Sequence, residues 1–234
     1  MGVNMLKSLS LIAILLFTVS GAQAGSIQGE IIFSGEVPAP KTIKTGKFSK
    51  VCGPLIQSDA LLVDNKRVKN AVIWLSGRGA KKLKAQSGEF PFDQKKCQYA
   101  PHVIVMAKDS TLEIHSSDPI NHNIHTYSFE NDPINVMLTP GQEYSQEFEE
   151  PEVVKVSCDL HSWMEAWVVV TPNSYSALTS KDGVFEIKDV PPGKYILNVW
   201  HEVFGEHRQK IKVRDDTINI NFDFAEISPQ VSKN

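Results

Sequence analysis

The chain has 234 residues, of which 41% are hydrophobic, enough for one large domain or two small ones with cores of their own. The 24 basic residues are outnumbered by 27 acidic ones, and the formal net charge is −3. This composition excludes a disordered chain, and the absence of excess positive charge disfavours binding to a nucleic-acid backbone.

The N-terminus has the pattern of a secretory signal peptide. Lys7 precedes the apolar run 9–19, which is followed by small residues and by Ala-Gln-Ala at 22–24. The run has about half of the roughly 20 residues that a membrane-spanning helix needs. We therefore expect residues 1–24 to be cleaved and the protein to be exported to the periplasm, with no membrane span in the mature chain. An uncleaved anchor helix is the alternative.

From residue 25 onward the sequence is strand-like almost throughout. Short β-rich runs bounded by turn residues lie at 27–33 and 71–75, whereas the Lys-, Gly- and Ser-rich segments 38–51 and 77–88 predict loops. Six further strands are expected at 102–106, 111–114, 124–129, 143–148, 153–158 and 167–171. So many short strands in about 70 residues favour a Greek-key β-sandwich.

A last group of strands is expected after residue 183. Its runs are 184–187, 195–200, 209–213 and 218–222. Asp182-Gly183 and Pro191-Pro192-Gly193 are strong turn signals, so these strands are expected to be antiparallel. Residues 226–234 are predicted to form a flexible tail. The fold class is therefore all-β, with a second β-sandwich beside the first.

Three cysteines in an exported chain leave one without a partner. Cys52 and Cys97 lie in polar, loop-like surroundings, and we predict that they form a disulfide. In the chain-entropy description such a bond stabilises the fold by roughly 3 to 4 kcal/mol. Cys158 ends an apolar alternating segment and is predicted to be the free thiolate.

Cys158, His161 and Met164 are spaced at i, i+3 and i+6 between two expected strands. Flanking strands argue against a helix, so the three side chains are expected to converge inside a tight loop. A soft thiolate, an imidazole and a weak thioether suit copper, and a second histidine would complete the ligand set of a blue-copper site. His122 and His125 are the candidates for that histidine.

The order of these motifs resembles the cupredoxins, the family of plastocyanin, pseudoazurin, azurin and amicyanin. The resemblance covers about residues 90–172 and is carried by Pro101-His102-Val103, His122-Asn123, Pro140-Gly141 and Cys158-x-x-His161-x-x-Met164. It implies that His122 is the first ligand and that Asn123, from the shell around the ligands, donates a backbone hydrogen bond to the ligand sulfur. His125 remains an alternative ligand.

The resemblance also implies how the protein meets a redox partner. His161 is expected to be an exposed edge of the site, with Leu160 and Trp163 as the apolar docking surface around it. An acidic stretch precedes Cys158 and comprises Glu143, Glu147, Glu149, Glu150 and Glu152. It would steer a basic partner such as a cytochrome c, and a merely solvated edge is the alternative.

Residues 175–199 resemble a different family, the carboxypeptidase regulatory-like or transthyretin-like β-sandwich. The turn sequences at 182–187 and 191–195 carry this resemblance, and the expected opening strand, 26–31, lies far upstream. We therefore expect the copper domain, 90–172, to be inserted between two parts of this sandwich, 25–89 and 173–225. Trp200-His201-Glu202 is expected to be a core Trp beside a satisfied His rather than a second metal site.

Taken together, the sequence predicts an exported protein that holds one copper ion, cycles it between Cu(I) and Cu(II), and carries single electrons. In these features it resembles the exported plastocyanin-like or methylamine-utilisation-type proteins of bacteria. No enzymatic activity is expected, because no Ser-His-Asp order, phosphate loop or His-x-His pair is present. The alternatives are a periplasmic copper carrier or metallochaperone, and a β-sandwich binding module with a structural copper site.

Overall fold

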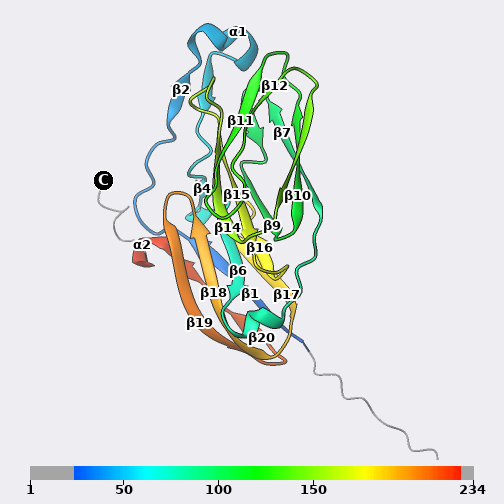
Figure 1. Ribbon diagram of the computed structural model, residues 1–234. Coiled ribbons are helices and arrows are strands. Elements are labelled where there is room, and N and C mark those ends of the chain that lie inside the picture. Colours follow the sequence, from blue (N-terminus) through cyan, green and yellow to red (C-terminus); the bar gives the residue numbers. More distant parts are fainter. Residues whose placement is uncertain (1–23, 228–234) are drawn as a thin grey trace, which may run out of the picture.

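A computed structural model describes residues 24–227 (Figure 1). The predicted signal peptide, apart from Ala24, and residues 228–234 of the predicted tail lie outside the described residues. The all-β prediction is confirmed, because the described chain consists mainly of strands and its helices are single turns. Between residues 24 and 227, no helix is long and apolar enough to cross a membrane.

Two sheets form the first sandwich, in the upper part of Figure 1. One has the order β13 (Glu143–Phe148), β10 (Ser110–Ser116), β7 (Glu89–Lys95) and β8 (Gln98–Ala100). The other has the order β12 (Asn135–Leu138), β11 (His122–Tyr127), β14 (Glu152–Ser157), β15 (Glu165–Thr171) and β9 (Val103–Ala107). Strands β7 and β9 pair in parallel with β10 and β15, and the other pairs are antiparallel.

Two further sheets form the second sandwich. The strands of the first are β17 (Val184–Val190), β1 (Gly25–Ile32), β5 (Arg67–Val68) and β4 (Val63–Asp64), with β20 (Thr217–Asn219) and β21 (Phe222–Asp223) paired to β1. The strands of the second are β16 (Ser176–Leu178), β6 (Val72–Ser76), β18 (Gly193–His201) and β19 (Gly205–Val213). Because β1 pairs with β17 and β20, segments from the two ends of the chain share one sheet.

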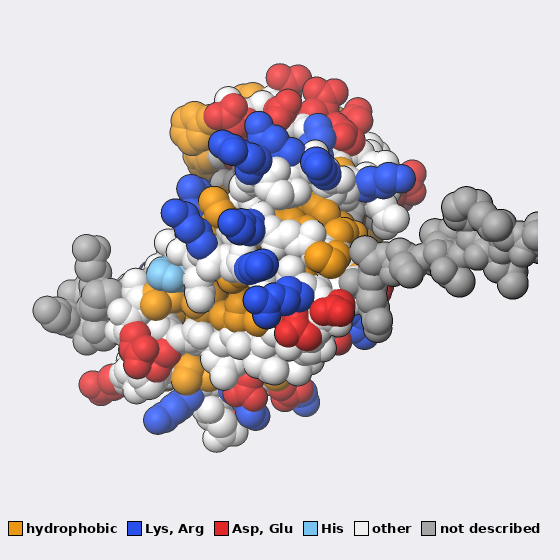
Figure 2. Space-filling model, turned by 90° about the horizontal axis from the view of Figure 1, so that it is seen from below, with side chains coloured by type: hydrophobic (Ala, Val, Ile, Leu, Met, Phe, Trp, Pro, Cys, Tyr) orange, Lys and Arg blue, Asp and Glu red, His pale blue; other side chains and the backbone are white. Residues whose placement is uncertain are grey.

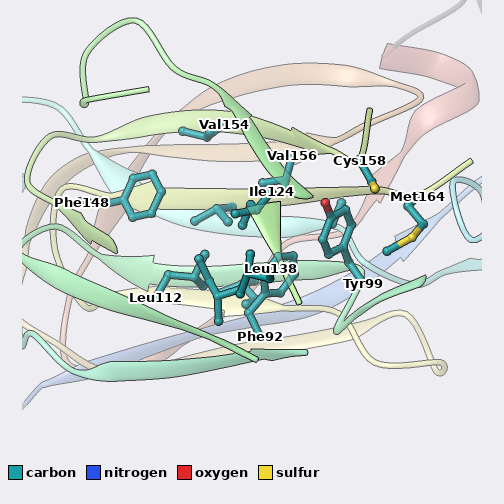
Figure 3. Close-up of a cluster of buried hydrophobic side chains, with 14 of the residues drawn as sticks. Phe92, Tyr99, Leu112, Ile124, Leu138, Phe148, Val154, Val156, Cys158 and Met164 are labelled. Atoms are coloured by element: carbon teal, nitrogen blue, oxygen red, sulfur yellow. The ribbon is translucent and has the colours of Figure 1, made fainter. Parts of the chain in front are cut away.

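Alternation of residue type explains how the first core forms. Along β10, every second residue is buried, and Leu112 and Ile114 are fully enclosed. These side chains meet Ile124 and Val156 from the opposite sheet in one hydrophobic cluster (Figure 3). Cys158 and Met164 belong to the same cluster and lie at one end of it, so the sulfur atoms of the motif sit at the edge of a dry core.

Strand β15 is buried on both faces because it lies between the two sandwiches. Val168 and Val170 face the first core, whereas Val169 packs with Val72 and Trp200. This explains the unbroken apolar run in the sequence of β15. A polar contact crosses the same junction, because Glu202 pairs with His102 and accepts a hydrogen bond of 3.0 Å from Trp167 Nε1.

The segment 41–57 overlaps the predicted loop 38–51 but has regular elements. It contains β2 (Thr42–Lys44), η1 (Gly46–Phe48), α1 (Ser49–Cys52) and β3 (Leu55–Gln57), and we call it the cap. β2 and β3 pair with each other, and Cys52 and Ile56 are buried in the first core. The cap therefore packs on the first sandwich, although the sequence assigned 25–89 to the second. The other short helices are η2 (Gly79–Lys82) and α2 (Phe224–Ile227).

His201 is a satisfied core histidine, as expected. Its ring is 1% exposed, Nδ1 accepts a hydrogen bond from the Val203 N–H at 3.2 Å, and the ring also bonds to the backbone of Lys69. Burial lowers the pKa of His201 to about 4, despite the opposing effect of Glu202. The folded protein therefore holds this imidazole neutral in the range where an unfolded chain protonates it.

This burial predicts a pH dependence of stability. Below an unfolded pKa of about 6.5, the unfolded chain binds a proton at His201 that the folded chain does not, so this contribution to stability is complete above that pH and is lost toward pH 4. Between pH 7 and pH 5, the wild type should lose about 2 kcal/mol more than His201→Gln. Urea unfolding of both proteins, free of metal ions, at the two pH values measures this, and equal losses would contradict it.

Candidate metal centre

Two consecutive reverse turns shape the loop between β14 and β15. The Cys158 carbonyl accepts a hydrogen bond from the His161 N–H, and the His161 carbonyl accepts one from the Met164 N–H, at 3.3 and 2.9 Å. The Cys158 N–H then closes the loop by donating to the Met164 carbonyl at 3.1 Å. The two-residue spacing on each side of His161 is therefore what two linked turns require, and it brings the three motif residues together.

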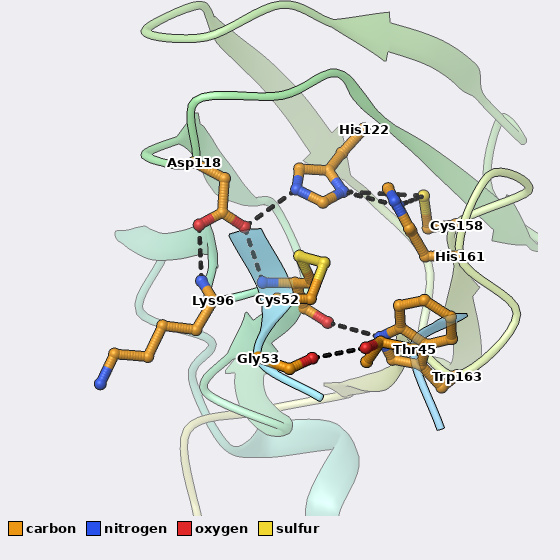
Figure 4. The surroundings of a disulfide bond; sticks show 10 residues. Thr45, Cys52, Gly53, Lys96, Asp118, His122, Cys158, His161 and Trp163 are labelled. Carbon is orange, nitrogen blue, oxygen red and sulfur yellow. Dashed lines mark hydrogen bonds and ion pairs between the residues drawn. A yellow bond between two sulfur atoms is a disulfide. The ribbon is translucent and has the colours of Figure 1, made fainter. Parts of the chain in front are cut away.

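Three ligand-type atoms converge beneath this loop (Figure 4). The Nδ1 atoms of His122 and His161 are 3.0 Å apart, and Cys158 Sγ lies 4.0 Å from the first and 3.6 Å from the second. All three residues are buried. A metal ion about 2.1 Å from nitrogen and about 2.3 Å from sulfur separates such atoms by roughly 3.5 Å. The observed distances bracket this value, so the three residues fit a metal ion.

Met164 is buried in the same core cluster as Cys158. The linked turns place its backbone against Cys158, and Figure 3 shows both side chains at the same end of the cluster. This location is compatible with a thioether at the apolar side of the centre. The predicted axial ligand therefore lies at the same end of the core as Cys158.

Asp118 is a functional residue that the sequence analysis missed. Its Oδ2 accepts a hydrogen bond of 2.9 Å from His122 Nε2, on the side of the ring away from Cys158 (Figure 4). The Lys96 and Cys97 N–H groups donate to the same carboxylate at 2.6 and 2.7 Å. The bond from Nε2 directs the Nδ1 lone pair of His122 toward the other ligands.

The β7–β8 hairpin holds this carboxylate in place. Its two loop residues, Lys96 and Cys97, have φ of +54° and +55°, the left-handed conformation of a tight two-residue hairpin turn. In this conformation both N–H groups point at Asp118. The turn lacks the Asn-Gly or Asp-Gly signal of such hairpins, which is why the sequence did not reveal it.

The disulfide between Cys52 and Cys97 is confirmed. It joins the cap to the same hairpin turn, and Trp163 Nε1 donates to the Cys97 carbonyl at 3.0 Å. Cys97 therefore connects the cap, the support of His122 and the ligand loop. Its sulfur also lies within 4.8 Å of the ligand-type atoms of Asp118 and His122.

His161 is not the exposed edge that the sequence predicted. It is 1% exposed, because Phe48 of the cap packs edge-on against its ring with the centroids 4.3 Å apart. Phe48 also contacts Trp163, which is only partly exposed. Of the predicted docking residues, Leu160 alone is open to solvent, at 44%. Sequence reasoning failed here because the covering residue is more than 100 positions upstream, in a segment read as a loop.

Asn123 and His125 make contacts other than those expected. The Asn123 side chain accepts from the Asp159 N–H at 2.7 Å and donates to the carboxylate of Asp159 at 2.9 Å, which ties β11 to the ligand loop. His125 Nδ1 pairs with Asp159 at 3.0 Å, and its ring stacks on Tyr127. His125 therefore lies outside the group of converging ligand atoms.

Electrostatics keep both ligand-type imidazoles neutral. Burial lowers the pKa of His122, although its hydrogen bond to Asp118 acts in the opposite direction. Burial, followed by the charges of His122 and Lys47, lowers the pKa of His161 to about 4. A metal ion therefore meets unprotonated imidazoles at neutral pH, without competition from a bound proton.

The predicted acidic stretch lies mainly away from this centre. Glu152 begins β14, about 20 Å along the strand from Cys158. The Glu152 carboxylate accepts hydrogen bonds from Ser128 and Asn131, so it serves the structure of a nearby turn. Glu143 begins β13 and contacts His115 at 3.0 Å. In these contacts neither Glu143 nor Glu152 meets a residue of the ligand loop.

Comparisons with known proteins give partial likenesses. No family model and no curated protein sequence matches the chain. A purple cupredoxin from Nitrosopumilus maritimus is 23% identical over 37% of this chain and 100% of its own, with a TM-score of 0.30. A Cu(I) form of an amicyanin mutant is 18% identical over 42% of this chain and 98% of its own, with a TM-score of 0.33.

A copper-containing nitrite reductase from Thermus scotoductus SA-01 is 18% identical over 42% of this chain, with a TM-score of 0.34. The match spans only 25% of the nitrite reductase chain. These scores do not establish a family for the whole chain.

Because the cap covers the ligand loop, we expect it to slow the access of reagents to the Cys158 thiol. In the metal-free protein, Phe48→Ala should speed the reaction of Cys158 with a thiol reagent about tenfold, as expected for losing about 1.4 kcal/mol of packing over the ligand loop. Phe129→Ala is the matched control, because Phe129 is 93% exposed. The rates at which the reagent modifies Cys158 in the two variants and the wild type measure this effect. An unchanged rate in Phe48→Ala would show that the cap does not limit access to Cys158.

Proposed function

We propose that this protein is a mononuclear copper protein that carries single electrons. The convergence of His122 Nδ1, His161 Nδ1 and Cys158 Sγ in a buried site is the observation that carries the proposal. Two imidazoles and a thiolate with a neighbouring thioether are the ligand set of blue-copper electron-transfer sites. Copper bound there would accept or release one electron by cycling between Cu(I) and Cu(II).

The surroundings of the ligands support a rigid centre. The linked turns hold Cys158 and His161, while Asp118 and the hairpin turn hold His122 from behind. The cap excludes solvent from His161 by covering its ring with Phe48. Ligands held in this way rearrange little when the charge of the centre changes, which favours fast electron transfer.

The burial of the ligands favours electron transfer over copper delivery. The side chains at 122, 158, 161 and 164 are each at most 2% exposed. A metallochaperone must pass its ion directly to the ligands of an acceptor, which requires ligands at the surface. An electron can instead pass through a few ångströms of packed protein, so burial does not prevent this role.

We also propose a periplasmic location and an inserted arrangement of domains. The disulfide supports an oxidising compartment. Pairing of β1 with β17 and β20 supports a second, transthyretin-like sandwich whose two parts precede and follow the copper unit. Detection of the protein in the periplasmic fraction would test the location. The visible spectrum of the copper protein purified from that fraction would test the ion.

Replacement of the sulfur ligand tests the assignment. Cys158→Ser should abolish the intense visible absorption of a thiolate-to-copper transition, because the sulfur donor is lost. Met164→Leu is the matched control: it should retain this absorption and raise the reduction potential, since a weak donor to the oxidised ion is removed. Spectra and voltammetry of both variants measure this, and an unchanged spectrum in Cys158→Ser would refute the site.

Removal of the charge behind His122 tests the role of Asp118. Asp118→Asn should raise the reduction potential, because the carboxylate favours the more positively charged oxidised centre through the His122 ring. Asp93→Asn is the control. The Asp93 carboxylate accepts a hydrogen bond of 2.8 Å from the Ser117 hydroxyl, and this substitution removes one nearby negative charge without altering the contact of His122. Voltammetry of the two variants should separate them, and equal potentials would leave Asp118 without this role.

A further inference from the structure

The outer surface of the cap is strongly basic. Lys41, Lys44, Lys47 and Lys50 recur at every third position and are all exposed. The sequence has no acidic residue from 37 to 58, and none of the four lysines forms an ion pair with a described residue. The whole chain carries −3, so the cap is opposite in sign to the molecule that bears it.

This basic surface stands directly over the candidate metal centre. Phe48, between Lys47 and Lys50 in the sequence, covers the His161 ring. The Lys47 ammonium lies 5.0 Å from the centre of the Phe48 ring. A partner in contact with Lys47 would therefore be separated from a metal ligand by one aromatic ring.

Apolar side chains are exposed on the cap and on the ligand loop beside it. Val51 and Leu55 belong to the cap, and Leu160 belongs to the loop of Cys158 and His161. Exposed apolar groups amid unpaired positive charges are the combination found at transient protein interfaces, where charge sets orientation and apolar contact closes the complex.

We propose that the cap is the docking surface for an acidic electron-transfer protein, oriented by Lys44, Lys47 and Lys50 and seated over Phe48. This deepens the proposed function, on which it rests, and replaces the basic partner expected from the acidic stretch. Charge complementarity favours an acidic partner, because the four lysines form no ion pair with a described acidic residue. They also share the cap with Phe48, which covers the ligand-type His161 ring through which an electron would leave. Glu152, about 20 Å along β14 from Cys158, does not offer that proximity.

The molecule also has a second basic surface, and its effect on an acidic partner has to be distinguished from the effect of the cap. Seen from the end away from α1, Lys and Arg side chains gather in a band across the second sandwich (Figure 2). Lys81, Lys82 and Lys84 lie in and just after η2, which contacts β6 and β18 of that sandwich. These three lysines provide a matched control for three lysines of the cap.

The reaction with a small redox ion tests the sign of the charge around the site of electron transfer, through the dependence of its rate constant on salt. The reduced copper protein gives one electron to ferricyanide, which becomes ferrocyanide. Net charge alone would make this reaction between two anions faster as salt is added. The proposal predicts the reverse: the second-order rate constant should fall several-fold from low to high ionic strength, because ferricyanide reacts at the basic cap.

Charge reversal on the cap should change that sign. Lys44→Glu, Lys47→Glu and Lys50→Glu, combined, should lower the low-salt rate constant about tenfold and make it rise with salt. The same change at Lys81, Lys82 and Lys84 should leave the wild-type behaviour intact. A rate constant that rises with salt in the wild type, or an equal response of the two triple variants, would overturn the proposal.

A copper-free measurement separates this proposal from the proposed function. Decaglutamate, added to the copper-free protein, should shift the amide NMR signals of the cap and of Leu160, and the cap variant should abolish these shifts. Shifts confined to the η2 lysines, or no shifts, would overturn the docking surface whatever the copper chemistry. Cap shifts in a protein that gives no thiolate-to-copper absorption would instead retain the surface and reject the electron carrier.

Discussion

The structure depends on holding two imidazole nitrogens and one thiol sulfur together inside a dry protein core. Such atoms lose their hydration when buried, and only a shared ion or tight hydrogen bonding compensates them. The chain meets this constraint by taking each group from a different rigid source. His122 comes from the start of β11, Cys158 directly follows β14, and His161 lies in the linked turns between β14 and β15. Neutral imidazoles are the electrostatic result of that burial.

Cys97 connects the parts that support this centre. Its N–H orients Asp118 behind His122, its carbonyl accepts from Trp163, and its sulfur fastens the cap. The disulfide therefore does more than stabilise the fold, because it also holds the cap that limits the contact of the centre with solvent. The cap replaces an exposed histidine edge by an aromatic ring and a set of lysines, and this changes the kind of partner that the surface fits.

Local patterns were sufficient to predict most of the longer strands and the ligand loop, but not short strands such as β8, β12 and β16. Alternation along β10 and β14 marked their buried faces, and the spacing of Cys158, His161 and Met164 matched two linked turns. Contacts between distant segments were not predictable in the same way. The cap has a polar composition typical of loops, and the hairpin turn at Lys96-Cys97 lacks a glycine signal. The support of His122 by Asp118 is created only when that turn, the disulfide and β10 meet.

Cu K-edge X-ray absorption of the copper-loaded protein tests the central claim most directly, because it reports which atoms surround the ion. The account predicts a first shell of one sulfur and two imidazole nitrogens, with the sulfur contribution lost in Cys158→Ser. A shell of oxygen and nitrogen atoms alone, unchanged by that substitution, would contradict it.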